Sequence, residues 1–146
     1  HGIVANEWYQ RQSKTFVNCV SDKTVQTVGS LSLEGQTSPR NLRTYTVTDQ
    51  LKLASPESKV ISISIKDRSS ILPGGHLSDG SYWYDYMTGM FISSTFYMDE
   101  LPKWVNDFNE KGEMLRYIGK EWNTFFDIPF QIVPISSFNS FVPFSV

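Results

Sequence analysis

Residues 59–66 carry the clearest alternation of apolar and polar positions in the chain. The two alternating sets are Ile61, Ile63 and Ile65 on one side and Ser62, Ser64 and Lys66 on the other. Successive side chains of a β-strand point to opposite faces, so a period of two predicts a strand. The seryl face is lined by small side chains, and we therefore expect another element to pack closely against it.

A helix is expected over residues 38–54, immediately before this strand. Its first two residues are serine and proline. A serine hydroxyl accepts an otherwise unpaired amide proton, and proline suits the first helical position. The spacing of Leu42, Tyr45 and Leu53 places these side chains on one face. A helix followed by a strand is typical of an α/β layer.

Three further elements are expected in the order helical turn, β-hairpin and helix. They span residues 67–72, 81–97 and 101–109. The hairpin is indicated by two aromatic segments on either side of a glycine-bearing turn at Thr88-Gly89. The second helix is indicated by an apolar patch of Trp104, Val105 and Phe108. Residues 24–33 predict a short strand or an extended loop.

The two ends of the chain differ from its middle. Residues 123–146 consist mainly of Phe, Ile, Val, Pro and Ser, with Asp127 as the single charged residue, and show no period. The chain starts at His1 and enters an aromatic segment at once. We therefore expect an internal fragment of a larger protein, with a divergent tail at 123–146.

Composition and charge exclude several classes of protein. The chain of 146 residues is 40% hydrophobic and 14% aromatic, which is enough for the core of one domain. Thirteen basic against fifteen acidic residues give a net charge of -2, so neither a nucleic acid nor an anionic membrane surface is an expected partner. No run approaches the roughly 20 apolar residues of a membrane span. Cys19 is the single cysteine and is interpreted as a buried small apolar residue.

Lys66 and Arg68 are the candidates for binding chemistry. They lie two positions apart at the end of the predicted strand, the edge at which open α/β sheets commonly bind ligands. A guanidinium offers a planar fork of donors and an ammonium adds a compact charge, so the pair suits an oxyanion. The spacing alone also fits a solvated surface pair or a salt bridge through Asp67.

Other chemistry-bearing residues favour structural interpretations. His1 and His76 are the only histidines, too few for a two-metal cluster, and His76 is interpreted as a locally hydrogen-bonded loop residue. Gly74-Gly75 has the spacing of a turn and not of a phosphate-binding loop. The serines at 62, 64, 69 and 70 lack a nucleophile context. The aromatic run around Trp83 and Tyr97 suits either a stacking surface or, more simply, core.

Several strings together carry a family resemblance. They are HGIVANEWY at 1–9, SPRNL at 38–42, ISIKDR at 63–68, ILPGGH at 71–76, YWYD at 82–85, TG at 88–89 and LPKWV at 101–105. In order and wording they resemble the zinc-dependent phosphatases of the type I phosphodiesterase and nucleotide pyrophosphatase branch of the alkaline phosphatase superfamily, especially the phosphomonoesterases of Bacteroidetes. The resemblance covers about residues 1–122.

The resemblance implies a site. An asparagine in the family's first string and the lysine and arginine of its Lys-x-Arg string contact the phosphate group, and Asn6, Lys66 and Arg68 match them. Two cations on the phosphate oxygens suit a dianionic monoester better than a diester, so a phosphate monoester is the expected substrate of the parent enzyme. A phosphodiesterase or nucleotide pyrophosphatase fragment, or a non-catalytic binding module derived from the family, is the alternative.

The same resemblance implies what this chain lacks. The family uses a threonine nucleophile about twenty residues before the position of Asn6, and two zinc ions held by Asp and His residues in other segments. We therefore expect no catalytic residue, no metal ligand and no cofactor in this chain, and no activity of the chain alone. The family resemblance also implies export to the periplasm or secretion.

The expected fold is α/β, part of a three-layer α/β/α alkaline-phosphatase-like domain. Residues 1–75 are expected to form the core part with the phosphate contacts. Residues 76–122 are expected to form a cap insert that contains the β-hairpin, and residues 123–146 the divergent tail.

Overall fold

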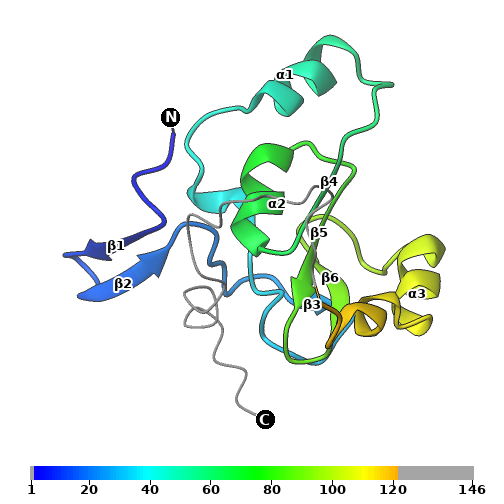
Figure 1. Ribbon diagram of the computed structural model, residues 1–146. Coiled ribbons are helices and arrows are strands. Elements are labelled where there is room, and N and C mark those ends of the chain that lie inside the picture. The colour runs from blue at the N-terminus through cyan, green and yellow to red at the C-terminus, as the bar shows by residue number, and fades with distance from the viewer. Residues whose placement is uncertain (1, 122–146) are drawn as a thin grey trace, which may run out of the picture. The chain divides into compact units, whose positions relative to one another are not determined.

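A four-stranded sheet organises the chain in the computed structural model, which describes residues 2–121 (Figure 1). The strand order is β3-β6-β5-β4. The strands are β3 (Thr27–Val28), β6 (Met90–Ser94), β5 (Gly80–Asp85) and β4 (Ile61–Ser64). β4 and β5 are parallel, with Ile63 opposite Tyr82, and the other pairs are antiparallel. The sheet lies in the first of two compact units, His1–Arg116, and the second comprises Tyr117–Val146.

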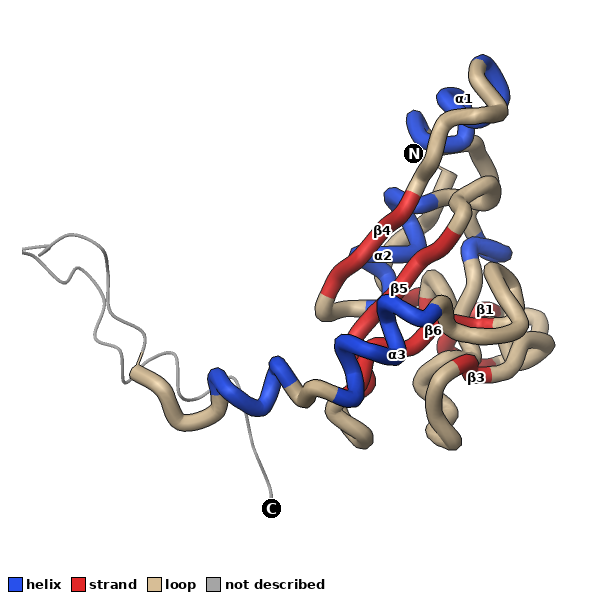
Figure 2. The backbone as a smooth tube through the Cα atoms, turned by 90° about the vertical axis from the view of Figure 1, so that its right-hand side faces the viewer, coloured by secondary structure: helices blue, strands red, loops and turns tan. Residues whose placement is uncertain are grey.

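Two helices lie on opposite faces of this sheet. Helix α2 (Asp67–Gly74) lies behind β4 and β5 in Figure 2, and α3 (Lys103–Glu110) lies in front of β5 and β6. Each interface has its own buried cluster. The cluster on the α2 side is Cys19, Val20, Ile71, Trp83 and Ile92, and that on the α3 side is Val28, Tyr82, Leu101 and Val105. A helical layer on each face of a sheet is the arrangement expected for part of an α/β/α domain.

Helix α2 approaches the sheet closely because the facing residues are small. The Ser70 hydroxyl donates a hydrogen bond to the Ser62 carbonyl at 2.9 Å. Gly74 lies so close to β4 and β5 that an added Cβ would be 2.5 Å from Ser81 Oγ and 3.2 Å from Ser62 Cβ. The close packing predicted for the seryl face of the strand is confirmed. Ile61, Ile63 and Ile65, on the opposite face, stay more than half exposed at 54%, 55% and 53%.

The helix expected over residues 38–54 divides into two elements. A 3-10 turn spans Pro39–Asn41, and helix α1 begins only at Val47 and ends at Ala54. Thr46 and Asp49 cause this division, because each side chain accepts the backbone N–H of the other and forms a capping box. A capping box fixes a new helix start, so the continuous helix was wrong and the serine cap at the 3-10 turn was right.

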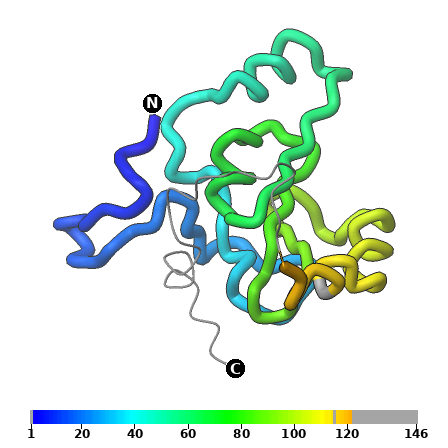
Figure 3. The backbone as a smooth tube through the Cα atoms, in the orientation of Figure 1, coloured from blue at the N-terminus to red at the C-terminus, as the bar shows by residue number. Residues whose placement is uncertain are grey.

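The segment before residue 20 forms a hairpin that the pattern did not predict. Strands β1 (Glu7–Gln10) and β2 (Thr15–Asn18) pair antiparallel, with Tyr9 and Phe16 rings in edge contact. The chain before β1 runs beside the loop preceding α1 (Figure 3), where the Arg43 amide donates to the Gly2 carbonyl at 2.6 Å. The connecting turn, residues 11–14, lacks the Asn-Gly or Asp-Gly signal of tight hairpins.

The remaining elements agree with the pattern. The predicted strand, the aromatic hairpin and the second helix appear as β4, β5–β6 and α3, and a short 3-10 helix, η2, spans Glu113–Tyr117. The hairpin continues the same sheet as β4. The assignment of residues 76–122 to a cap stays a prediction, and the tail at 123–146 lies outside the described residues. No helix within residues 2–121 is long and apolar enough to cross a membrane.

A buried carboxylate, Asp22, fixes the loop between β2 and β3. It accepts hydrogen bonds from Thr24 Oγ1 at 2.6 Å and Ser38 Oγ at 2.7 Å, and the Arg40 guanidinium lies 3.3 Å away. Burial raises the pKa of the Asp22 carboxyl, but these hydrogen bonds outweigh burial and lower its pKa from 3.8 to about 2. The folded chain therefore favours the ionised carboxylate.

We expect Asp22 to make the fold sensitive to acid. Its contribution is complete above the unfolded pKa near 4 and is lost as the pH falls through about 2, because the unfolded chain then binds the proton more readily. The loss in free energy of unfolding over this window is about 2 kcal/mol. Asp22→Asn should flatten the pH dependence in urea unfolding between pH 2 and 6, and the exposed Asp99→Asn should not. An unchanged slope in Asp22→Asn would contradict the assignment.

The α2 contact predicts a compensating pair of substitutions. Gly74→Ala should lower the free energy of unfolding by about 1–3 kcal/mol, because the new methyl group meets the buried Ser81 hydroxyl. Adding Ser81→Ala removes that hydroxyl and should restore part of the loss. A double-mutant cycle by urea unfolding measures the coupling. Strictly additive effects would show that the contact does not limit how closely α2 packs.

Candidate phosphate-binding site

The candidate site lies where β4 passes into α2. Lys66 is the residue that precedes α2, in extended conformation, and Arg68 lies in the first turn of the helix. Both side chains line one cavity of about 150 Å³ at the end of β4 and β5. The other lining residues are Glu34, Ile65, Asp67, Trp83, Tyr84 and Tyr86. The structure thus brings the two predicted cations together at the carboxyl edge of two parallel strands, where ligands of α/β sheets commonly bind.

Neither cation forms an ion pair with a described residue. Within residues 2–121, no carboxylate lies within 4.0 Å of the Lys66 ammonium or the Arg68 guanidinium. The salt bridge through Asp67, considered above, does not form: Asp67 Oδ1 instead accepts the backbone N–H of Arg68 at 2.6 Å. Lys66 is exposed and Arg68 is half-buried. Both cations can therefore bind an external anion without breaking an internal ion pair.

Asn6 does not line this cavity. It is exposed just before β1, and its carbonyl accepts the backbone N–H of Cys19 at 2.9 Å. Cys19 is fully buried against the same cluster as Trp83, a wall of the cavity, which confirms its interpretation as a small apolar residue. Burial raises the pKa of the Cys19 thiol, and the nearby Arg68 charge opposes that rise. The backbone of Asn6 thus contacts Cys19, which belongs to the same buried cluster as Trp83. The phosphate role of the Asn6 side chain stays a prediction.

Hydrogen bonds of two side chains, Trp83 and Asp85, fix the walls of the cavity. The Trp83 indole N–H donates to the Glu34 carbonyl at 3.1 Å. The buried Asp85 carboxylate accepts from the Met87 N–H at 2.9 Å and from Thr88 Oγ1 at 2.8 Å. Burial raises the pKa of Asp85, but its hydrogen bonds prevail and its pKa is lowered. The turn after β5 is therefore fixed beside the cavity.

Sequence reasoning did not find these wall residues as a set. Glu34 follows β3, whereas Tyr84 and Tyr86 lie on β5 and just after it, so their proximity depends on the pairing of both strands with β6. The available signal was the aromatic alternation at residues 82–86, which the sequence offered either as core or as a stacking surface. Trp83 is buried, which confirms the core interpretation for this residue, whereas Tyr86 is exposed and a stacking role of the aromatic run stays a prediction.

His76 forms its hydrogen bonds with Asp49 of the nearby helix α1. The His76 amide donates to Asp49 Oδ1 at 2.8 Å, and His76 Nδ1 lies 3.4 Å from Asp49 Oδ2. Burial raises the pKa of the Asp49 carboxyl, but the hydrogen bonds from Thr46, Leu77 and His76 lower its pKa overall. The interpretation of His76 as a locally bonded loop residue is confirmed.

The described residues do not supply a set of metal ligands. Among residues 2–121, no group of three or more His, Cys, Asp and Glu side chains is arranged to hold a metal ion. The cavity itself combines two cations with two carboxylates and aromatic rings. Its two cations can bind an anion, whereas its two carboxylates are fewer than the three protein ligands of a typical catalytic zinc site.

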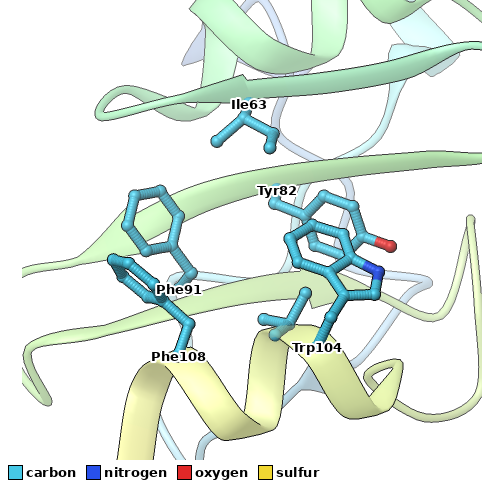
Figure 4. A pocket seen from close by; sticks show the side chains of 6 residues that line it. Ile63, Tyr82, Phe91, Trp104 and Phe108 are labelled. Carbon is cyan, nitrogen blue, oxygen red and sulfur yellow. The ribbon is translucent and has the colours of Figure 1, made fainter. Parts of the chain in front are cut away.

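A second cavity, of about 130 Å³, is apolar. It lies between β4, β5 and α3, and Figure 4 shows Ile63 facing the aromatic rings across it. Its lining residues are Ile63, Tyr82, Phe91, Trp104, Val105 and Phe108. Without a charged group it cannot hold a phosphate, and it belongs to the seam between the sheet and α3.

Comparison with known proteins identifies the class of protein. No family model matches the chain. The chain is 56% identical over 129 residues to alkaline phosphatase PhoV of Synechococcus elongatus, and 53% identical over 130 residues to alkaline phosphatase PafA of Elizabethkingia meningoseptica. Each match covers 88% of this chain and 24% of the relative. A protein of Myroides odoratus named calcium-transporting ATPase is 45% identical over 129 residues.

The solved structure of PafA gives the same result for the fold. It superimposes with a TM-score of 0.81 at 50% identity, covering 94% of this chain and 26% of PafA. The chain is therefore a homologue of the alkaline phosphatases and has part of their fold. It spans about a quarter of the length of these curated relatives.

The unpaired cations give a prediction about stability. Because no described residue pairs with them, Lys66→Ala and Arg68→Ala should each change the free energy of unfolding by less than about 0.5 kcal/mol. Asp85→Ala removes a buried carboxylate that receives several hydrogen bonds and should cost about 2 kcal/mol or more. Urea unfolding of the three variants makes the comparison. A large loss in either cation variant would reveal a structural role.

Proposed function

We propose that this chain supplies the phosphate-binding part of an alkaline-phosphatase-like phosphomonoester hydrolase. The observation that carries the proposal is the cavity at the end of β4 and β5, in which Lys66 and Arg68 lie together without an ion-pair partner in the part of the chain that the structure describes. The homologues named alkaline phosphatase support this choice.

The two side chains complement each other on a phosphate group. A guanidinium donates two parallel hydrogen bonds to two oxygens, and an ammonium adds a third, mobile charged donor. Two positive charges match the dianion of a phosphate monoester better than the monoanion of a diester. We therefore propose a monoester as substrate of the complete enzyme, in preference to the diesters or nucleotides of the phosphodiesterase branch.

A second solved structure supports the proposal that Asn6, Lys66 and Arg68 contact the phosphate. It is described as a PafA variant in which a threonine, an asparagine, a lysine and an arginine are replaced together. The lysine and arginine of PafA are two positions apart, as Lys66 and Arg68 are here. The asparagine of PafA precedes its lysine by 62 positions, and Asn6 precedes Lys66 by 60. We propose that Asn6 also contacts the phosphate in the complete enzyme.

We assign neither the nucleophile nor the metal ligands of the reaction to a residue of this chain. The family resemblance supports a threonine nucleophile and two zinc ions, which when bound activate the attacking oxygen and stabilise the leaving oxygen. We propose that residues 2–121 bind and orient the phosphate, and that the chain alone does not turn over. We also propose export to the periplasm or beyond, on the same family resemblance.

Phosphate binding by the chain tests the proposal. Titration with methylphosphonate, a dianion that cannot be hydrolysed, should shift the backbone amide signals of residues 65–69 in NMR spectra. Lys66→Ala and Arg68→Ala should each weaken binding about tenfold or more, since a hydrogen bond to a charged group contributes roughly 1.5–3 kcal/mol.

Lys103→Ala is the matched control, because Lys103 is highly exposed on α3 and does not line the cavity. It should bind methylphosphonate as the unaltered chain does. Equal affinities in all three variants would sink the assignment of the site.

A further inference from the structure

Two tyrosines share the cavity with the phosphate-binding cations. Tyr84 and Tyr86 line it together with Lys66 and Arg68. Tyr84 is half-buried, whereas Tyr86 is 63% exposed. The cavity of about 150 Å³ has room for more than the five heavy atoms of a phosphate group. A ligand held by the two cations would therefore have aromatic side chains beside it in the same cavity.

The ring of Tyr86 is held in place although it is exposed. It packs edge to face on Tyr84, with ring centroids 5.3 Å apart, and Tyr84 packs in the same manner on Phe91 at 5.7 Å. Phe91 contacts Phe108 of α3 at 5.8 Å, the pair of rings visible at one end of the apolar cavity in Figure 4. A continuous row of aromatic rings thus runs from Phe108 of α3 to Tyr86 at the phosphate cavity.

The backbone around Tyr86 is fixed as well. Asp85 is fully buried and accepts hydrogen bonds from the Met87 amide and the Thr88 hydroxyl, on the far side of Tyr86. The backbone that carries the Tyr86 ring is therefore ordered before a ligand binds, and the ring itself rests on Tyr84 on one side. Preorganisation of the backbone favours binding because a ligand does not have to order it.

We propose that Tyr86, supported by Tyr84, is a specificity-determining residue that receives an aromatic leaving group of the phosphate monoester. The inference rests on the proposed function, because Lys66 and Arg68 must hold the phosphate for the leaving group to reach the ring. Aromatic rings attract one another in stacked or edge-on geometry beyond the area they bury. Glu34 and Asp67, on the same cavity, add negative charge beside the two cations, which disfavours leaving groups with further phosphates.

The experiment compares two phosphonates that differ in one group, at a pH at which both are dianions. Phenylphosphonate and methylphosphonate are titrated into the 146-residue chain and into its Tyr86→Leu variant, with NMR signals of residues 65–69 as the readout. The unaltered chain should bind phenylphosphonate about 3- to 10-fold more tightly, the range expected for one aromatic pair. In Tyr86→Leu the ratio of the two affinities should fall toward one.

Tyr45→Leu is the matched control, because Tyr45 is 58% exposed and does not line the cavity. It should keep the preference for phenylphosphonate. A ratio of one in the unaltered chain, or a ratio that survives Tyr86→Leu, overturns the leaving-group site and leaves the proposed function standing. Failure of methylphosphonate to bind overturns the proposed function and this inference together.

Discussion

The close contact between α2 and the small-residue face of the sheet determines where the candidate site can form. Ser62, Ser70 and Gly74 let the helix lie directly against β4 and β5, and one hydrogen bond from Ser70 to the Ser62 carbonyl fixes their relative position. The turn between β4 and α2 carries both cations. Any widening of the helix–sheet distance would therefore move Lys66 and Arg68 relative to the aromatic walls of the cavity.

The buried carboxylates and the two cations of the cavity have different roles in this fold. The buried carboxylates Asp22, Asp49 and Asp85 are satisfied mainly by backbone amides and hydroxyl groups. Such neutral donors stabilise the ionised form without consuming a cation. Lys66 and Arg68 thereby stay available, and the cavity presents two cations without an ion-pair partner among residues 2–121, in a chain with a net charge of -2.

The sequence predicted those elements whose signals are local. The alternation at residues 59–66, the glycine turn after β5 and the apolar patch of α3 each depend on neighbouring residues alone, and each was confirmed. The division of the first helix followed from a reciprocal cap between Thr46 and Asp49, which outweighed the helix start at residue 38. The β1–β2 hairpin has no turn signal, and the cavity walls depend on strand pairing across distant segments, so neither could be derived from periodicity.

The outer edge of β4 affects how the chain is expected to behave in concentrated solution. Among the described residues no strand pairs with this edge, and the three isoleucines beside it remain more than half exposed. An open strand edge next to branched apolar side chains is a template for pairing with another copy of the same strand. We therefore expect self-association through this edge at the concentrations used for spectroscopy, and Ile63→Lys should reduce it, because a charge beside an open edge opposes pairing.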